Sequence, residues 1–97
     1  MVKVGLLAKV VAKAGMEEEV AGFLGGAVAL ARAEGQTVTW YAFRAGPAEF
    51  GVFDTFAGDE GRQAHLSGEI AKALMGNADR LLAEPPSIRA IDILAQK

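Results

Sequence analysis

The feature of the sequence that most constrains its fold is a pair of β-rich runs at its centre. Residues 36–45 read QTVTWYAFRA and residues 49–57 read EFGVFDTFA; both are rich in β-branched and aromatic residues, which favour strands. They are separated by a segment with Gly46-Pro47, a dipeptide typical of turns. The pattern predicts two neighbouring strands joined as a hairpin.

The segments on either side of this hairpin predict further strands and helices. Residues 2–12 alternate with period two, which predicts a strand, and Gly15 ends it. Residues 16–34 predict a helix that begins with three acids, and residues 60–76 predict a second one with Asp59 as its N-cap. A short helical piece is expected at 79–82, and a last strand at 87–95 follows Pro85-Pro86.

The predicted order, strand-helix-strand-strand-helix-strand, is the ferredoxin-like arrangement of an α+β protein. Residues 1–97 are expected to form one domain, with a four-stranded antiparallel sheet and both helices on one face. Both faces of the predicted strands carry apolar residues, whereas the helices cover only one. We therefore expect a homodimer in which two sheets pack face to face; the sequence leaves open which face is which.

Composition excludes several classes of function. The net charge is −2 without a basic cluster, which argues against a nucleic-acid partner. The sequence contains no run of about 18 apolar residues, so no membrane span is predicted. Cysteine is absent, so disulfides and thiolate metal sites are excluded. The apolar N-terminal stretch is interrupted by lysines and lacks a cleavage signal, so a cytoplasmic protein is expected.

Asp54 is an acid on an otherwise apolar strand face. By alternation it shares its side with Phe50, Val52 and Phe56, whereas Phe53 points the other way. A buried acid must be paired, hydrogen-bonded or protonated. Asp54 is therefore either structural, paired with an arginine such as Arg44 or bonded to a backbone group near a strand end, or functional, as an acid/base group or substrate anchor in a cavity.

His65 is the only histidine of the chain. It lies in the second predicted helix, where spacing makes Arg62 and Glu69 its neighbours. It is either a structural histidine bonded to a residue such as Glu69, or a general base or hydrogen-bond donor that points into the gap between helix and sheet. A lone histidine without cysteine does not predict a metal site.

Most aromatic residues lie on the central hairpin. They are either core residues or a wall that suits a flat, apolar ligand. In the second interpretation the ligand would contact Trp40, Tyr41, Phe53 and Phe56, with Arg44 beside them.

The stretch EFGVFDTFAGDEGRQAHL, followed by an apolar helix and LLAEPPSIRAIDIL, resembles the antibiotic biosynthesis monooxygenase family. The opening VGLLAKVVAKAGMEEEVAGFL also fits that family's strand, glycine turn and acidic helix start. The resemblance implies a dimeric α/β barrel with a cavity between sheet and helices in each subunit. It also implies oxidation of quinols or phenols by molecular oxygen without a cofactor, with His65 as a base or anchor for a phenolic hydroxyl and Asp54 close by.

The chain departs from the catalytic residues of parts of that family. The haem-degrading branch has an asparagine on the first strand, a tryptophan in the second helix and an iron-binding histidine one helical stretch later. In this chain the only asparagine is Asn77, after the second helix; His65 stands at the place of the tryptophan, and Met75 stands near the place of the histidine. Phe56 replaces a common tryptophan. Three functions stay open: a cofactor-independent oxygenase, a non-catalytic ligand-binding protein, and a purely structural dimer.

Overall fold

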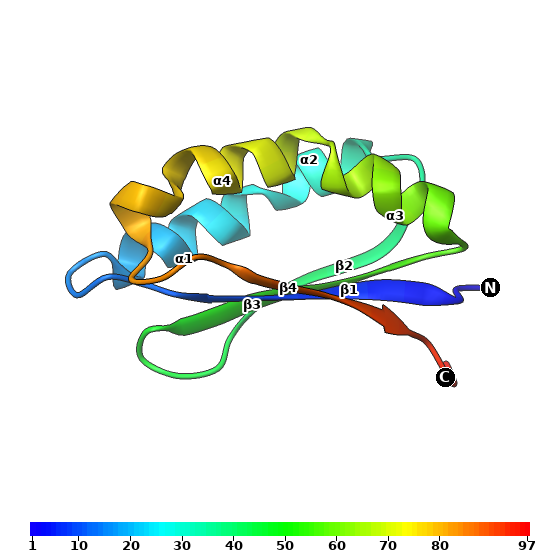
Figure 1. Ribbon diagram of the computed structural model, residues 1–97, viewed down its shortest axis with the longest axis horizontal. Helices are drawn as coiled ribbons and strands as arrows, with labels where there is room; N and C mark the ends of the chain where they lie inside the picture. Colours follow the sequence, from blue (N-terminus) through cyan, green and yellow to red (C-terminus); the bar gives the residue numbers. More distant parts are fainter.

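The computed structural model describes all residues, 1–97, and contains one four-stranded sheet covered by four helices (Figure 1). The strands are β1 (Val4–Val11), β2 (Thr37–Arg44), β3 (Glu49–Phe56) and β4 (Ser87–Asp92). The helices are α1 (Glu17–Gly26), α2 (Val28–Ala33), α3 (Asp59–Leu66) and α4 (Glu69–Leu81). No helix is both long and apolar enough to cross a membrane.

The sheet has the strand order β2-β3-β1-β4, and every neighbouring pair is antiparallel. This order confirms the ferredoxin-like arrangement predicted from the sequence. Strands β1 and β3 lie in the centre, so their residues are the most buried of the sheet. The predicted hairpin is formed by β2 and β3, with a register shift between Thr37 and Thr39.

All four helices lie on one side of the sheet, and the opposite side is uncovered (Figure 1). The structure thus settles which face is which. The face under the helices carries Leu6 and Val10 of β1 together with Phe50, Val52, Asp54 and Phe56 of β3, and these residues are buried. The uncovered face, which we call the open sheet face, carries Leu7, Tyr41, Phe43, Phe53 and Ile91.

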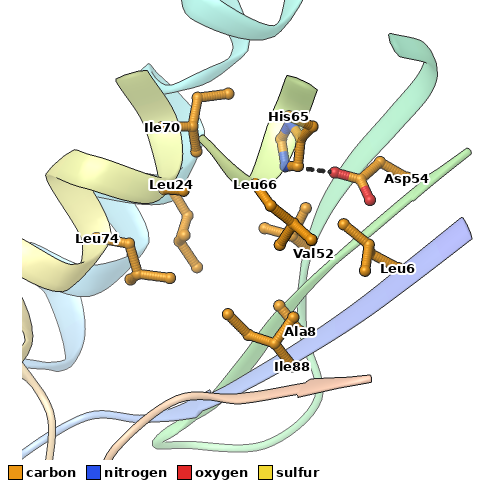
Figure 2. A pocket seen from close by; sticks show the side chains of 11 residues that line it. Leu6, Ala8, Leu24, Val52, Asp54, His65, Leu66, Ile70, Leu74 and Ile88 are labelled. Carbon is orange, nitrogen blue, oxygen red and sulfur yellow. Dashed lines mark ion pairs between the residues drawn. The ribbon is translucent and has the colours of Figure 1, made fainter. Parts of the chain in front are cut away.

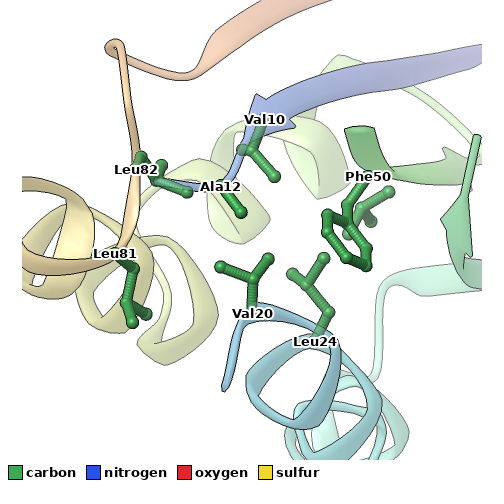
Figure 3. Packing of buried hydrophobic residues seen from close by; sticks show 8 residues of the cluster. Val10, Ala12, Val20, Leu24, Phe50, Leu81 and Leu82 are labelled. Atoms are coloured by element: carbon green, nitrogen blue, oxygen red, sulfur yellow. The ribbon is translucent and has the colours of Figure 1, made fainter. Parts of the chain in front are cut away.

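The main hydrophobic core lies between the helices and one end of the sheet (Figure 3). Val20 and Leu24 of α1 contact a cluster contributed by β1, β3 and the end of α4. The other members are Val10, Ala12, Phe50, Val52, Leu81 and Leu82. Val20 and Leu24 therefore mark the buried side of α1, and the three glycines of that helix face open space.

Both predicted helices are interrupted, and the prediction of continuous helices was wrong. The first breaks at Ala27, directly after Gly25-Gly26, because consecutive glycines weaken a helix. The second breaks at Ser67-Gly68, where the Ser67 hydroxyl bonds to carbonyls of the preceding turn.

The ends of the later elements also differ from the sequence prediction. The N-cap of α3 is Gly58, and Asp59 is the first helical residue and makes no side-chain cap. Helix α4 continues to Leu81 and so includes most of the short piece predicted at 79–82. Strand β4 ends at Asp92 rather than at residue 95.

Candidate functional site

Asp54 and His65 meet between the sheet and the helices. Asp54 lies on β3, where its direct neighbours across the sheet are Leu6 on β1 and Trp40 on β2. His65 lies near the end of α3, which follows β3 after a short turn. Oδ2 of Asp54 and Nε2 of His65 are 2.9 Å apart, and both side chains are buried. The structure thus brings together the two residues that the sequence analysis singled out.

The orientation of this pair leaves the Asp54 carboxylate with unused bonding capacity. The Nε2–Oδ2 contact has the length of an ion pair, yet neither oxygen of Asp54 accepts a directed hydrogen bond. Asp54 is only 1% exposed. A buried carboxylate normally accepts several hydrogen bonds, so these oxygens have acceptor capacity for a ligand.

His65 has a second acidic partner, Glu34, which the sequence analysis missed. Nδ1 of His65 lies 2.6 Å from Oε1 of Glu34, the residue directly after α2. Glu69, the neighbour expected from helical spacing, contacts Lys72 instead. No sequence pattern connects Glu34 with His65, because the contact depends on how α2 and α3 pack.

The two carboxylates decide the charge of His65. Burial alone would lower the pKa of the imidazole, but its close contacts with the Asp54 and Glu34 carboxylates outweigh this effect. Together they raise the pKa of His65 from 6.5 to about 9. The ring is therefore an imidazolium at neutral pH. In that state the ring can donate a proton and has no free nitrogen to accept one.

A small cavity lies against the Asp54–His65 pair (Figure 2). It has a volume of about 40 Å³, measured as space for the centres of water-sized molecules. Such a space admits a few water-sized groups. The two polar residues lie at one end, and the rest of the wall is aliphatic (Figure 2). The other lining residues are Leu6, Ala8, Leu24, Val52, Leu66, Ile70, Ala71, Leu74 and Ile88.

The cavity has a buried end and an exposed end. Asp54 and His65 are buried, whereas Leu66 and Ile88 are more than a third exposed. A molecule that enters from the surface would pass these two aliphatic side chains before it reaches the carboxylate. The mouth therefore lies between α3 and the edge strand β4.

The aromatic residues predicted to hold a ligand do not line this cavity. Tyr41 and Phe53 lie on the open sheet face, on the other side of the sheet from His65. Trp40 is on the helix side and packs against the core, and its indole N–H is buried without a hydrogen-bond partner. Phe56 is fully buried and contacts the His65 ring, with ring centroids 5.6 Å apart.

Arg44 is also distant from the pair. It pairs with Glu18 at 3.1 Å and stacks on the ring of Phe50. Its register partner on β3 is Phe50, about 13 Å along the strand from Asp54. The expectation that Arg44 pairs with Asp54 was wrong, because the sheet register separates the two residues.

Arg62 holds α3 in place beside the site. Its guanidinium donates hydrogen bonds to the backbone carbonyls of Gly5 and Ile91, on β1 and β4, and it also pairs with Asp59. Since Arg62 lies one helical turn before His65, these bonds fix the helix that carries the imidazole. No group of three or more acidic or histidine side chains is arranged to hold a metal ion.

The fold is that of the antibiotic biosynthesis monooxygenases. A putative monooxygenase of this kind from Nitrosomonas europaea superposes with a TM-score of 0.83 at 12% identity, over 95% of this chain and 90% of that one. A second antibiotic biosynthesis monooxygenase gives a TM-score of 0.81 at 14% identity, over 95% and 99% of the two chains. At these identities the likeness concerns the fold, which the sequence resemblance predicted correctly.

One solved structure is similar in sequence as well. NE2512 from Nitrosomonas europaea, a protein of unknown function, is 50% identical over 100% of this chain and 94% of its own, with a TM-score of 0.98. The chain belongs to the family of NE2512. No protein-family model and no curated protein sequence matches it.

Proposed function

We propose that this chain is a cofactor-independent monooxygenase that oxidises a phenol or quinol with molecular oxygen. The observation that carries the proposal is the buried carboxylate of Asp54, which has no directed hydrogen bond and lines an otherwise apolar cavity beside a charged imidazole. A hydroxyl group is the kind of ligand that such a carboxylate binds, because it donates one hydrogen bond and carries a proton that can be removed.

The pair divides the acid and base roles between its members. Asp54 accepts the hydroxyl proton, and the resulting phenolate is electron-rich enough to reduce dioxygen. His65, charged at neutral pH, stabilises the developing oxygen anion and donates a proton to it. Two groups of different charge state in one cavity are a recurring arrangement for acid–base chemistry.

The reaction balances without any other reactant. A bond forms between one oxygen atom and a ring carbon, and the O–O bond then breaks. The ring keeps one oxygen, and the second leaves as water with the hydrogens of the hydroxyl group and of the attacked carbon. The proton taken up by Asp54 passes to His65 across the 2.9 Å contact, so the pair returns to its initial state.

The shape of the cavity supports a ligand that enters edge first. Its space fits the hydroxyl-bearing edge of a ring, and the aliphatic mouth formed by Leu66 and Ile88 would cover the remainder. Exclusion of water by these side chains strengthens the electrostatic interactions inside.

Oxygen uptake by the metal-free protein tests the proposal. The substrates are monocyclic hydroquinones and dihydroxynaphthalenes, each compared with its autoxidation blank. We expect uptake above the blank for at least one substrate, and a fall of about 100-fold or more in Asp54→Asn, the usual loss when a general base is removed. Asp92→Asn, at an exposed position on β4, is the matched control and should keep full activity.

A second variant tests the cavity itself. Ala71 lines its wall, and Ala71→Leu would fill much of the space while leaving both polar residues in place. We expect this variant to lose uptake as well. No uptake for any substrate by the folded wild type would overturn the proposal, and calorimetric binding of the same quinols without turnover would instead support a non-catalytic ligand-binding protein.

A further inference from the structure

His65 separates two hollows of different character. On its Nε2 side lies the small apolar cavity that contains Asp54. On its Nδ1 side lies an outer hollow of about 300 Å³ that is lined mostly by polar residues and glycines. Glu34 belongs to this outer hollow, with Gln36 and Thr37 beside it. The imidazole therefore connects a carboxylate in the interior with one near the surface.

The Glu34 carboxylate is held firmly against the ring. Its Oε1 lies 2.6 Å from Nδ1 of His65 and also accepts a hydrogen bond of 2.8 Å from the Thr37 hydroxyl. Gly68, at the junction of α3 and α4, packs closely over the other oxygen: a methyl group at this position would lie 3.0 Å from Oε2. The His65 ring and the Thr37 hydroxyl thus both bind the same oxygen of Glu34.

An acceptor fixed at Nδ1 controls the orientation and the charge of the ring. It requires a proton on Nδ1, and it turns Nε2 toward the cavity and Asp54. A second negative charge also makes loss of the ring proton less favourable. Without Glu34 only Asp54 would hold the ring at a nitrogen, and the ring would lose its proton more readily.

We propose that Glu34 is a positioning residue that holds His65 as an imidazolium with its Nε2 edge toward Asp54. The structural part of this proposal is independent of any reaction. Its catalytic consequence, that Glu34 keeps the proton donor charged during turnover, rests on the oxygenase function proposed above.

Proton NMR of the free protein tests the structural part directly. Because His65 is the only histidine, its ring gives a single set of signals that needs no assignment. In the wild type we expect the titration midpoint near 9. Glu34→Gln should lower the midpoint by about one unit or more, since a charge partner at contact distance shifts a pKa by about 1–3 units.

The matched control is Glu69→Gln. Glu69 is the acid that helical spacing places next to His65, but it is exposed and contacts Lys72 in the structure. The substitution Glu69→Gln should leave the titration midpoint of His65 unchanged. An unchanged midpoint in folded Glu34→Gln, or an equal fall in Glu69→Gln, would overturn the proposal.

A further variant keeps the test decisive if Glu34→Gln does not fold. Thr37→Val removes only the hydroxyl that anchors Oε1 and should lower the midpoint less, in the same direction. If it leaves the midpoint unchanged, the anchored acceptor has no influence on the ring and the proposal fails.

The kinetic readout is the pH profile of oxygen uptake. The alkaline limb of kcat should follow the His65 midpoint measured by NMR and move to lower pH in Glu34→Gln, with kcat changed more than KM. If the protein shows no oxygenase activity, the NMR result still decides the role of Glu34, so the two proposals fail separately.

Discussion

Nε2 of His65 and Oδ2 of Asp54 lie 2.9 Å apart, although the first belongs to the helix layer and the second to the centre of the sheet. Each group depends on the other, because an isolated charge at either position would be costly to bury. The contact therefore joins the two layers of the fold and sets the chemistry of the cavity at the same time. The strength of this contact can be measured through the pKa of the His65 imidazole.

Stability should fall as the pH rises through the alkaline range. The pKa of His65 is about 9 in the folded chain and 6.5 when the ring is free of its partners. The stabilisation is complete below pH 6.5, where both states bind the proton, and it is lost as the pH passes 9. We expect the free energy of unfolding to decrease over this window by at most about 3 kcal/mol, measured by urea denaturation.

The control for this prediction is His65→Gln, which cannot titrate. Its unfolding free energy should be nearly constant across the same window, although its absolute stability will differ. A wild-type curve as flat as that of the variant would show that Asp54 and Glu34 do not raise the pKa of the ring.

We expect two copies of the chain to associate through the open sheet face. Tyr41 is 59% and Phe43 is 37% exposed, and both lie beside Leu7, Phe53 and Ile91 on a face that no helix covers. Contiguous apolar surface of this kind is usually covered by a partner. Tyr41→Glu should weaken association by about 100-fold or more, because an unpaired buried charge costs about 3–5 kcal/mol.

Sedimentation equilibrium measures this association. Leu30→Glu places the same charge at a position on α2 that is 42% exposed, and it should leave association intact. Since the open sheet face lies on the side of the sheet away from His65, the histidine NMR signal should titrate as in the wild type in both variants. A wild type that is monomeric at high concentration would refute the prediction.

Gly51 should not tolerate a side chain. A Cβ atom there would lie 2.3 Å from the Phe43 ring and 2.7 Å from the carbonyl oxygen of Ala8. Gly51→Ala must therefore displace the ring and distort the β1–β3 pairing, which we expect to cost about 1–3 kcal/mol in thermal or urea unfolding.

Gly22→Ala is the opposite case and serves as its control. Gly22 lies in α1, and a methyl group there would meet no atom within 4 Å. Alanine is the better helix former, so this variant should gain up to about 1 kcal/mol. Equal effects of the two substitutions would mean that the close contacts at Gly51 do not influence stability.

The sequence was sufficient to predict the strands and their order, because alternation and turn residues are local signals. It also placed Asp54 on the same strand side as Phe50 and Phe56, which the structure confirms. The helix breaks at Ala27 and Ser67 were missed, since no proline marks either of them in the sequence.

The site was predicted less completely than the fold. Helical spacing suggested Glu69 as the partner of His65, but the partner is Glu34, from a distant segment brought close by packing. Similarly, Arg44 is separated from Asp54 by the register of the sheet, a property that composition does not encode. The aromatic residues of the hairpin were a plausible ligand surface as a group. Because side chains alternate along a strand, however, these residues lie on both faces of the sheet.

The cluster of Glu34, His65 and Asp54 exists only when α2, α3 and β3 are assembled. Between pH 6.5 and 9 the ring is charged in the folded chain and mostly neutral in the unfolded one. Near the middle of this range, folding should therefore take up close to one proton from the solvent. In a weakly buffered solution, folding of this protein raises the pH and its unfolding lowers the pH.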